Sequence, residues 1–286
     1  MRRLILLSFI AIGLLAACSG APDAGQFRTG LQLYSVRQDL EADFTGTLQR
    51  VKDMGYDGVE FYNAFAGFTP QQVRQICDGI GLEVFSNHFP LQAVMTDLDR
   101  VLEDSKTLGL TFVTIPSIPS RPGATPDRFK ETVAALDSIG AKVREAGFVL
   151  LYHNHDFEFA QLPDGTVGHD YMFASSDPDR LQMELDVCWA DFAGQDVPAM
   201  VRRYAGRVPV LHMKDYTREG IGNRRIEFRP LGHGVMDLDA VLEAARESGV
   251  RWLCVEQDEP ATGAADRFEG PAASAVYLQE EIAAGS

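Results

Sequence analysis

"FVLLYHNH", residues 148–155, is an apolar run that ends in two histidines two positions apart. A short run of apolar and aromatic residues that ends in polar ones predicts a buried β-strand. Side chains two positions apart on a strand point to the same face, so we expect His153 and His155 to point in one direction together. Whether they meet a metal, a substrate or neither depends on what other strands bring to the same place.

Seven further runs of this kind recur along the chain. They are "LQLYSV" from Leu31, "GVEFY" from Gly58, "LEVFSNH" from Leu82, "FVTIPS" from Phe112, "LQMELDVCW" from Leu181, "VPVLHMKD" from Val208 and "WLCVEQD" from Trp252. With residues 148–155 they make eight predicted strands, in which 148–155 is the fifth.

Amphipathic stretches with helical spacing lie between most of these strands, and each ends near a glycine. Examples are Phe44, Leu48 and Val51; Val94, Leu98, Val101 and Leu102; and Leu238, Val241, Leu242 and Ala245. Strand and helix that alternate eight times over residues 28–286 predict an α/β fold, a single-domain (β/α)8 TIM barrel. A doubly wound open sheet is the alternative, but no predicted strand is followed by the GxGxxG turn that such folds use to bind dinucleotides.

The N-terminus carries an export signal. Residues 1–17 contain two arginines, an apolar run from Leu4 to Leu15 and small residues before Cys18, which predicts a cleaved signal peptide. "LLAACSG" resembles a bacterial lipobox, so we expect lipidation of Cys18 and a lipid-anchored tether over residues 18–27. Ser19, in place of Asp, favours the periplasmic face of the outer membrane. An ordinary cleaved signal peptide is the alternative, and it exports the protein as well.

The charge of the chain excludes one class of partner. It has 26 basic and 41 acidic side chains, and removal of Arg2 and Arg3 with the signal leaves 24 against 41, a net charge near −17. Nucleic-acid phosphates demand a basic face, so we expect no nucleic-acid partner, and a membrane contact only through the lipid anchor. The outer helix faces carry no pattern that specifies an oligomeric state.

Apart from Cys18, three cysteines remain after the signal, an odd number without a CxxC pair. They are Cys77, Cys188 and Cys254. The last two lie in apolar, strand-like runs. We therefore expect buried free thiols, with disulfides as the alternative in an oxidising compartment.

The carboxyl ends of the predicted strands are polar, and in a parallel barrel these ends form the active site. They carry Glu60, His88, His153 with His155, Glu184 with Asp186, His212 with Lys214 and Asp215, and Glu256 with Asp258. One such residue is more often a hydrogen-bonded rim residue than a ligand. Several together leave uncompensated charge unless a cation or a substrate balances it, which favours a metal site over a solvated rim.

Several motifs together resemble those of the sugar phosphate isomerase/epimerase superfamily, the xylose isomerase-like TIM barrels. They are "GYDGVEFY", "YHNHDFEF", "ELDVCWADFAG", "GRVPVLHMKD", "PLGHGVMDLD" and "CVEQDE", in an order that spans residues 31–281. The superfamily includes ketose 3-epimerases, inosose dehydratase and endonuclease IV. The resemblance implies a divalent metal at the carboxyl ends of strands five to eight.

Carried over to this chain, the resemblance places metal ligands at Asp186, His212 and Glu256. The strand-five ligand falls on His153, where the commoner pattern has Glu. Glu184 points the same way as Asp186 by strand alternation and is an alternative source of the missing carboxylate. Mixed imidazole and carboxylate ligation suits Mn²⁺, our first expectation, with Zn²⁺, Co²⁺, Fe²⁺ or Mg²⁺ as alternatives to it.

A divalent ion that holds a carbonyl oxygen and its neighbouring hydroxyl acidifies the C–H between them. We therefore expect an isomerase, an epimerase or a related lyase that removes this proton, and the histidine at strand five favours a lyase over the two-Glu epimerases. The predicted catalytic residues are His155 as acid or base, Glu256, and Lys214, which holds an oxyanion or hydroxyl. The alternative for Lys214 is an ion pair with Asp215 or Glu227.

Four further side chains are predicted to bind the sugar. Glu60 and His88 would bind hydroxyls, while Trp189 and Phe89 would stack against the ring, with core packing as the alternative for Trp189. The exported, acidic chain offers no evident phosphate cradle, so we expect a small non-phosphorylated sugar or a keto-glycoside as substrate.

Two rival functions remain. An endonuclease IV-like nuclease is disfavoured by charge and export, and because Trp189 stands where that enzyme needs a second histidine. A lipid-anchored sugar-binding protein without turnover is the alternative from another functional class.

Overall fold

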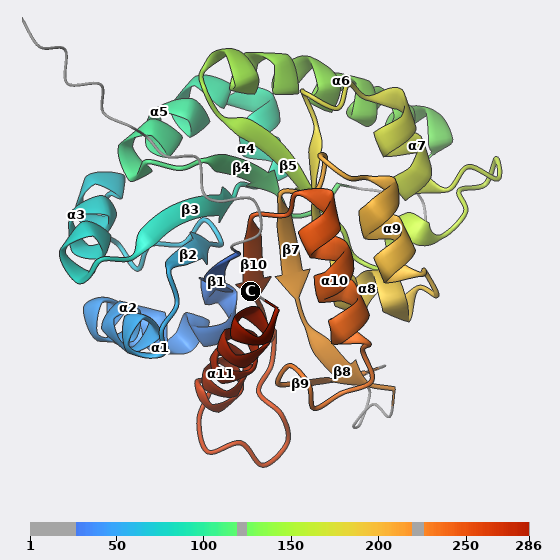
Figure 1. Ribbon diagram of the computed structural model, residues 1–286. Helices are drawn as coiled ribbons and strands as arrows, with labels where there is room; N and C mark the ends of the chain where they lie inside the picture. The colour runs from blue at the N-terminus through green and yellow to red at the C-terminus, as the bar shows by residue number, and fades with distance from the viewer. Residues whose placement is uncertain (1–26, 119–124, 219–225, 286) are drawn as a thin grey trace, which may run out of the picture.

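The computed structural model describes residues 27–118, 125–218 and 226–285. Its centre is a closed barrel of parallel strands that follow chain order, with the first strand paired to the last (Figure 1). The barrel strands are β1 (Arg28–Gln32), β2 (Gly58–Phe61), β3 (Glu83–His88), β4 (Phe112–Ile115), β5 (Val149–His153), β6 (Gln182–Asp186), β7 (Val210–Met213) and β10 (Trp252–Val255). The predicted (β/α)8 TIM barrel is confirmed.

Helices surround the barrel (Figure 1). They are α1 (Arg37–Ala42), α2 (Phe44–Asp53), α3 (Pro70–Ile80), α4 (Leu91–Thr96), α5 (Leu98–Leu108), α6 (Pro126–Glu145), α7 (Gly168–Ser175), α8 (Val187–Phe192), α9 (Val197–Arg203), α10 (Leu238–Ser248) and α11 (Glu269–Ala284), with 3₁₀ turns η1 (Leu33–Val36) and η2 (Phe157–Phe159). Helix α2 buries Phe44, Leu48 and Val51, the stripe predicted from spacing. The stripe from Val94 to Leu102 is divided instead between α4 and α5, because the chain leaves helical geometry at Asp97.

Seven of the eight predicted strands end earlier than their predicted runs, and three of these ends bear on the site. β1 stops at Gln32, whose side chain accepts a hydrogen bond from the Tyr34 N–H and starts η1. β6 stops at Asp186, because that side chain caps α8 by accepting from the Trp189 N–H. β5 stops at His153, so His155 lies beyond the strand.

An antiparallel hairpin follows β7 and was not predicted. It pairs β8 (Asp215–Thr217) with β9 (Glu227–Arg229), outside the barrel (Figure 1). The Asp215 carboxylate accepts hydrogen bonds from the backbone N–H groups of Gly232, Gly234 and Met236. Asp215 therefore holds the loop after the hairpin.

Aromatic side chains fill the amino end of the barrel. Phe85 and Trp252 stack with ring centroids 4.0 Å apart, and Phe112, Leu151, Val210 and Cys254 complete this cluster. Gly30 on β1 makes room for it, because a Cβ there would lie 2.5 Å from the Phe85 ring. The polar residues therefore gather above this apolar floor, at the carboxyl end.

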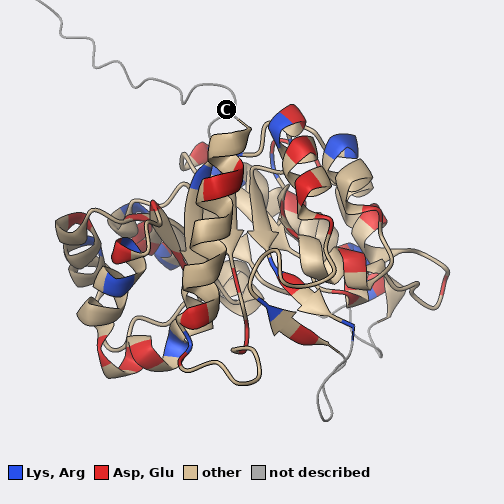
Figure 2. Ribbon diagram, turned by 60° about the horizontal axis from the view of Figure 1, so that its bottom comes forward, with Lys and Arg blue, Asp and Glu red and all other residues tan. Residues whose placement is uncertain are grey.

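Cys77, Cys188 and Cys254 are buried and free, as predicted. Acidic residues lie along the outer helices, with basic residues among them (Figure 2). Within the described ranges, the helices are all too short or too polar to cross a membrane. The predicted signal peptide 1–17, the lipidation site Cys18 and residues 18–26 of the predicted tether lie outside the described residues.

Candidate metal centre and active site

A cavity of about 500 Å³ opens at the carboxyl end of the barrel. Its lining is made of Tyr34, Tyr62, His88, Pro90, Pro116, His153, His155, Trp189, Lys214, Glu256, Asp258 and Glu259. The lining combines imidazole and carboxylate groups with the aromatic rings of Tyr34, Tyr62 and Trp189. Such a pocket, apolar with a few convergent polar groups, is the usual form of a small-molecule site.

The parallel strands bring the predicted residues together by register. His153 pairs with Glu184 across β5 and β6, and Asp186 pairs with His212 across β6 and β7. Each of these four side chains is at most 2% exposed. Since residues two apart on a strand share a face, Glu184 and Asp186 both point inward, one layer apart.

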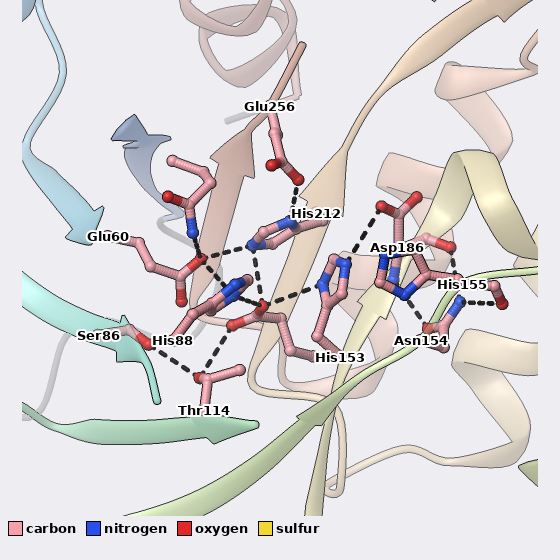
Figure 3. Close-up of polar contacts among 12 residues, drawn as sticks. Glu60, Ser86, His88, Thr114, His153, Asn154, His155, Asp186, His212 and Glu256 are labelled. Atoms are coloured by element: carbon pink, nitrogen blue, oxygen red, sulfur yellow. Dashed lines mark hydrogen bonds and ion pairs between the residues drawn. The ribbon is translucent and has the colours of Figure 1, made fainter. Parts of the chain in front are cut away.

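Four of the inward atoms form a closed ring of contacts (Figure 3). His212 Nε2 lies 2.7 Å from Glu60 Oε1 and 2.9 Å from Glu184 Oε1. His88 Nε2 lies 3.0 Å from Glu60 Oε1 and 2.8 Å from Glu184 Oε1. We call these four side chains, Glu60, His88, Glu184 and His212, the inner ring.

A second cluster lies nearer the mouth and consists of Asp186, Lys214, Glu256 and Asp258, the outer cluster. The Lys214 ammonium is at its centre, with Nζ 2.9 Å from Asp186 Oδ2 and 2.7 Å from Glu256 Oε2. Asp258 lies 3.3 Å from the same nitrogen. Lys214 therefore pairs with these carboxylates, in place of the predicted alternatives.

Those alternatives, Asp215 and Glu227, have other partners. The Asp215 carboxylate accepts from backbone N–H groups, and Glu227 pairs with Arg229 at 2.7 Å. Strand alternation turns Lys214 inward, toward the ends of β6 and β10.

Two imidazoles, His212 of the inner ring and His153, contact residues of both the inner ring and the outer cluster. His153 Nδ1 is 3.2 Å from Glu184 Oε1, while its Nε2 is 3.8 Å from Asp186 Oδ2. His212 presents Nε2 to the inner ring and Nδ1 to Glu256 Oε2, at 3.0 Å. The two histidines therefore belong to either of two ligand sets.

Both sets suit a divalent ion. Ligand atoms of His88, His153, Glu184 and His212 lie within 4.8 Å of one another, and so do those of His153, Asp186, His212 and Glu256, the predicted set. Burial and the positive charge of His212 lower the pKa of His153 well below its usual range, which leaves a neutral ring with a lone pair for a metal. His153 Nδ1 and Asp186 Oδ2 are both buried, and their charged neighbours are Glu184 Oε1 at 3.2 Å and Lys214 Nζ at 2.9 Å. Each atom is a potential metal ligand as well as a partner in an ion pair.

The inner ring has strongly shifted pKa values. Burial lowers the pKa of His88, but Glu60 and Glu184 outweigh it and raise that pKa to about 10. Burial and Glu60 raise the pKa of Glu184, but His212 and His88 lower it to about 2. In the outer cluster, burial raises the pKa of Asp258 to about 7, against the opposing effect of Lys214. Shifts of this kind gather at functional sites.

His155 lies at the mouth, on the loop after β5. Its ring contacts His153 with centroids 5.0 Å apart and stacks on Phe157 at 5.4 Å. Its backbone N–H donates to Glu158 Oε2 at 2.8 Å, and Glu158 also accepts a hydrogen bond from Tyr152 Oη. The two histidines were predicted to point the same way from one strand. The strand ends at His153, and the His155 ring contacts the His153 ring from the loop that follows.

The predicted sugar-binding residues divide into two groups. His88 and half-buried Trp189 line the cavity. Glu60 lies below it, fully buried, where its carboxylate accepts from Gln32 Nε2 at 2.7 Å and contacts the inner-ring histidines, so it does not reach the cavity. Phe89 is 3% exposed in the hydrophobic core outside the lining, so its predicted stacking on a sugar is wrong.

The sequence interpretation missed several neighbours of the site. Asn154 accepts from the Asp186 N–H at 3.0 Å and donates to the Asp186 carbonyl at 3.3 Å, which ties β5 to β6. Tyr34 and Tyr62 form an edge-to-face pair at the mouth. Asn154 lies between His153 and His155 in "YHNH", so its position in the sequence could have indicated that it is near the site. Nothing comparable in the sequence indicated that Tyr34 and Tyr62 line the cavity.

Comparison with known proteins assigns the family. A family model described as xylose isomerase-like TIM barrel matches residues 48–274. The chain belongs to this family. An inosose dehydratase of Lacticaseibacillus casei is 27% identical over 172 residues, 55% of this chain and 56% of that protein. The chain thus spans little more than half the length of the curated relatives it matches.

Solved structures of the family agree with the fold. A sugar phosphate isomerase/epimerase from Parabacteroides distasonis has 26% identity and a TM-score of 0.71, with 91% of this chain and 95% of that chain covered. A xylose isomerase-like TIM barrel protein from Mycobacterium smegmatis, in complex with magnesium, has a TM-score of 0.63 at 15% identity, with 91% and 97% covered. The family thus includes sugar enzymes and metal-bound proteins, and the buried cluster here is consistent with a divalent metal.

Proposed function

We propose that this protein is a divalent-metal-dependent enzyme that removes a proton next to a carbonyl group of a non-phosphorylated sugar or keto-glycoside, as an isomerase, an epimerase or a 3-keto-glycoside lyase. One observation carries the proposal. Buried imidazoles and carboxylates with metal-ligand spacing form the floor of a cavity whose wall holds His155 and Lys214.

The metal would be held by His153 and His212, with Asp186 and Glu256 or with His88 and Glu184 as the remaining ligands. Such an ion would act as a Lewis acid at a carbonyl oxygen of the substrate and would make the neighbouring C–H easier to deprotonate. Mn²⁺ is the ion we expect from mixed imidazole and carboxylate ligands, with Zn²⁺, Co²⁺, Fe²⁺ or Mg²⁺ as alternatives.

The chain's own residues would move the proton and hold the substrate. His155 is half-buried at the mouth, beside His153, where it can accept a proton from a bound sugar and return it. Glu256, on the same wall, is the second candidate for this role. Lys214 would donate to a substrate oxygen, and Trp189 would cover one face of the ring.

The cavity disfavours a phosphate group. Among its lining residues Lys214 is the one Lys or Arg, and it already contacts three carboxylates. A phosphate would meet a net negative wall, which costs free energy unless further cations are supplied. The proposed export of the chain, with signal 1–17 and lipidation at Cys18, also favours substrates without phosphate.

A substrate screen tests the proposal. Keto-sugars and 3-keto-glycosides are incubated with the protein and Mn²⁺, and products are separated by mass and by stereochemistry. We expect turnover that a chelator abolishes and added metal restores. A ligand that binds, measured by calorimetry, without any turnover in the presence of metal would instead support the sugar-binding alternative.

A further inference from the structure

Two tyrosines line the cavity on the wall opposite His155. Tyr34 lies on η1, after β1, and Tyr62 follows β2. On the other wall, His155 follows β5 and Trp189 follows β6. In the strand order of the closed barrel, two strands separate β1 from β6 in one direction, and two separate β2 from β5 in the other. The tyrosines therefore face Trp189 and His155 across the mouth.

Tyr34 is held in place although it is 38% exposed. The guanidinium of Arg37 lies over its ring at 4.1 Å, and the ring of Tyr62 meets it edge to face with centroids 5.6 Å apart. Arg37 Nη1 also donates to the Tyr34 carbonyl at 2.9 Å. An aromatic ring that is exposed and already fixed loses little conformational entropy when a ligand covers it.

The backbone after β2 fixes the second tyrosine. Asn63, the residue after Tyr62, has a φ of 62°, in the left-handed region, and its N–H donates to Asn87 Oδ1 at 2.8 Å. This conformation costs free energy in a residue other than glycine, and such residues gather at binding sites. Both rings are thus preorganised at the mouth.

The carboxylate beside the tyrosines is already paired. Glu259 Oε1 lies 2.6 Å from Arg37 Nη2, and its Oε2 lies 3.4 Å from Arg267 Nη2. Neither arginine is among the lining residues of the cavity. This wall therefore presents aromatic rings and a paired carboxylate, which suit a neutral ring with an apolar face.

The cavity has room for more than one sugar ring. Its volume of about 500 Å³ lies within the range of about 300 to 1,000 Å³ that is typical of sites for drug-sized ligands. A sugar beside Trp189 and His155, as the proposed function places it, leaves the tyrosines on the opposite wall uncovered. A second ring attached to that sugar would cover them.

We infer that Tyr34 and Tyr62 form a second subsite, which binds a neutral ring joined to the reacting sugar, so that the substrate is a glycoside and not a free monosaccharide. The inference rests on the proposed function for the reacting keto-sugar and narrows its substrate class. The second ring is a sugar or an aromatic aglycone, since each presents an apolar face to a tyrosine ring.

Calorimetry with ligands that do not react tests the subsite without relying on turnover. Methyl glycosides, phenyl glycosides and disaccharides of the common hexoses are titrated into the protein with Mn²⁺ present. We expect Kd for a phenyl glycoside or a disaccharide to be about 10-fold lower than Kd for the methyl glycoside of the same sugar, because an added aromatic contact contributes on this scale. The tighter of the two identifies the second ring as aromatic or as a sugar.

Variants assign this preference to the tyrosines. Tyr62→Ala should reduce it to less than about threefold and change Kd for the methyl glycoside little, while Tyr62→Phe, which keeps the ring, should retain it. Trp189→Ala should weaken both kinds of ligand alike, because Trp189 is proposed to cover the reacting sugar. Circular dichroism checks folding, and Tyr34→Ala replaces Tyr62→Ala if that variant does not fold.

Equal binding of methyl glycosides and two-ring ligands, absence of binding by all of them, or a preference that Tyr62→Ala leaves intact would overturn the inference. Turnover of a free monosaccharide at the same kcat/KM as its glycosides would also overturn it and leave the proposed reaction intact. A preference that depends on the tyrosines, in a protein that turns nothing over with metal present, would support the subsite and overturn the proposed reaction instead.

Discussion

His212 belongs to every group of ligand-type side chains that the described residues bring together. It is fully buried, and its two ring nitrogens face opposite sets of carboxylates. Loss of this ring would remove a donor from either candidate set, so its substitution tests for a metal without assuming where the metal lies. His155 contrasts with it, because it lies beside the centre but in none of the ligand groups.

Replacement of His155 by Gln therefore separates proton transfer from metal binding. We expect kcat to fall by about 10² to 10⁴, the usual contribution of one general acid or base, while metal content stays at the wild-type level. Steady-state kinetics and metal analysis on the same preparation check both parts. Unchanged kcat would remove His155 from the mechanism, and loss of metal would make it a ligand.

The residue types at the site were largely predictable, because each one ends a strand. "ELD", "LHMK" and "VEQ" have inward residues at fixed alternation, and the structure brings these residues together in overlapping groups at the carboxyl end of the barrel. The pairing of Lys214 with Asp186 and Glu256 was not predictable, since it depends on the distance across the barrel between β6, β7 and β10. Strand order gives neighbours, but it does not give that distance.

At the scale of an element, the loop after β5 decides where His155 lies. β5 ends at His153, and Glu158 on η2 accepts hydrogen bonds from the His155 N–H and from Tyr152 Oη. Burial raises the pKa of Glu158 to about 7 from an ordinary 4.5, although these two hydrogen bonds oppose the rise. Alternation along the strand predicted that the two histidines point the same way. The hydrogen bonds by which Glu158 anchors this loop could not be predicted from the sequence, because they depend on the folded path of the chain after β5.

This anchor predicts a pH dependence of stability. Because the folded state binds the Glu158 proton more tightly than the unfolded state, its contribution is complete below about pH 4.5 and is lost as pH rises through 7. The difference in free energy of unfolding, wild type minus Glu158→Gln, should therefore decrease by about 2 kcal/mol between pH 5 and pH 8. Urea titrations at several pH values measure it, and a difference independent of pH would show that the shift is absent.

At the scale of the whole molecule, the barrel closes where β1 meets β10 and β2. Its interior changes from an aromatic floor of Phe85 and Trp252 to polar side chains at the mouth. Strand number, order and parallel direction were all predictable from the eight apolar runs and the helical spacing between them. The hairpin β8–β9 was not, because its strands have three residues each and carry no alternation long enough to recognise.

Gly30→Ala tests this closure. The new methyl group would lie 2.5 Å from Phe85, which is held against Trp252, so we expect the free energy of unfolding to fall by about 1 to 3 kcal/mol. Gly79→Ala is the matched control, since Gly79 lies in α3 and a methyl group there would have nothing within 4 Å. The control should be neutral or stabilising by up to about 1 kcal/mol. Equal effects of the two would mean that the barrel floor is not tightly packed.

The central claim is that a metal at this centre assists removal of a proton beside a carbonyl. It is tested most directly by solvent deuterium incorporation into a keto-sugar or 3-keto-glycoside, followed by NMR at the carbon next to the carbonyl. We predict incorporation by the Mn²⁺-loaded wild type, none after chelation, and none by His212→Ala with the same added metal. Exchange that persists without metal, or in His212→Ala at the wild-type rate, would contradict the claim.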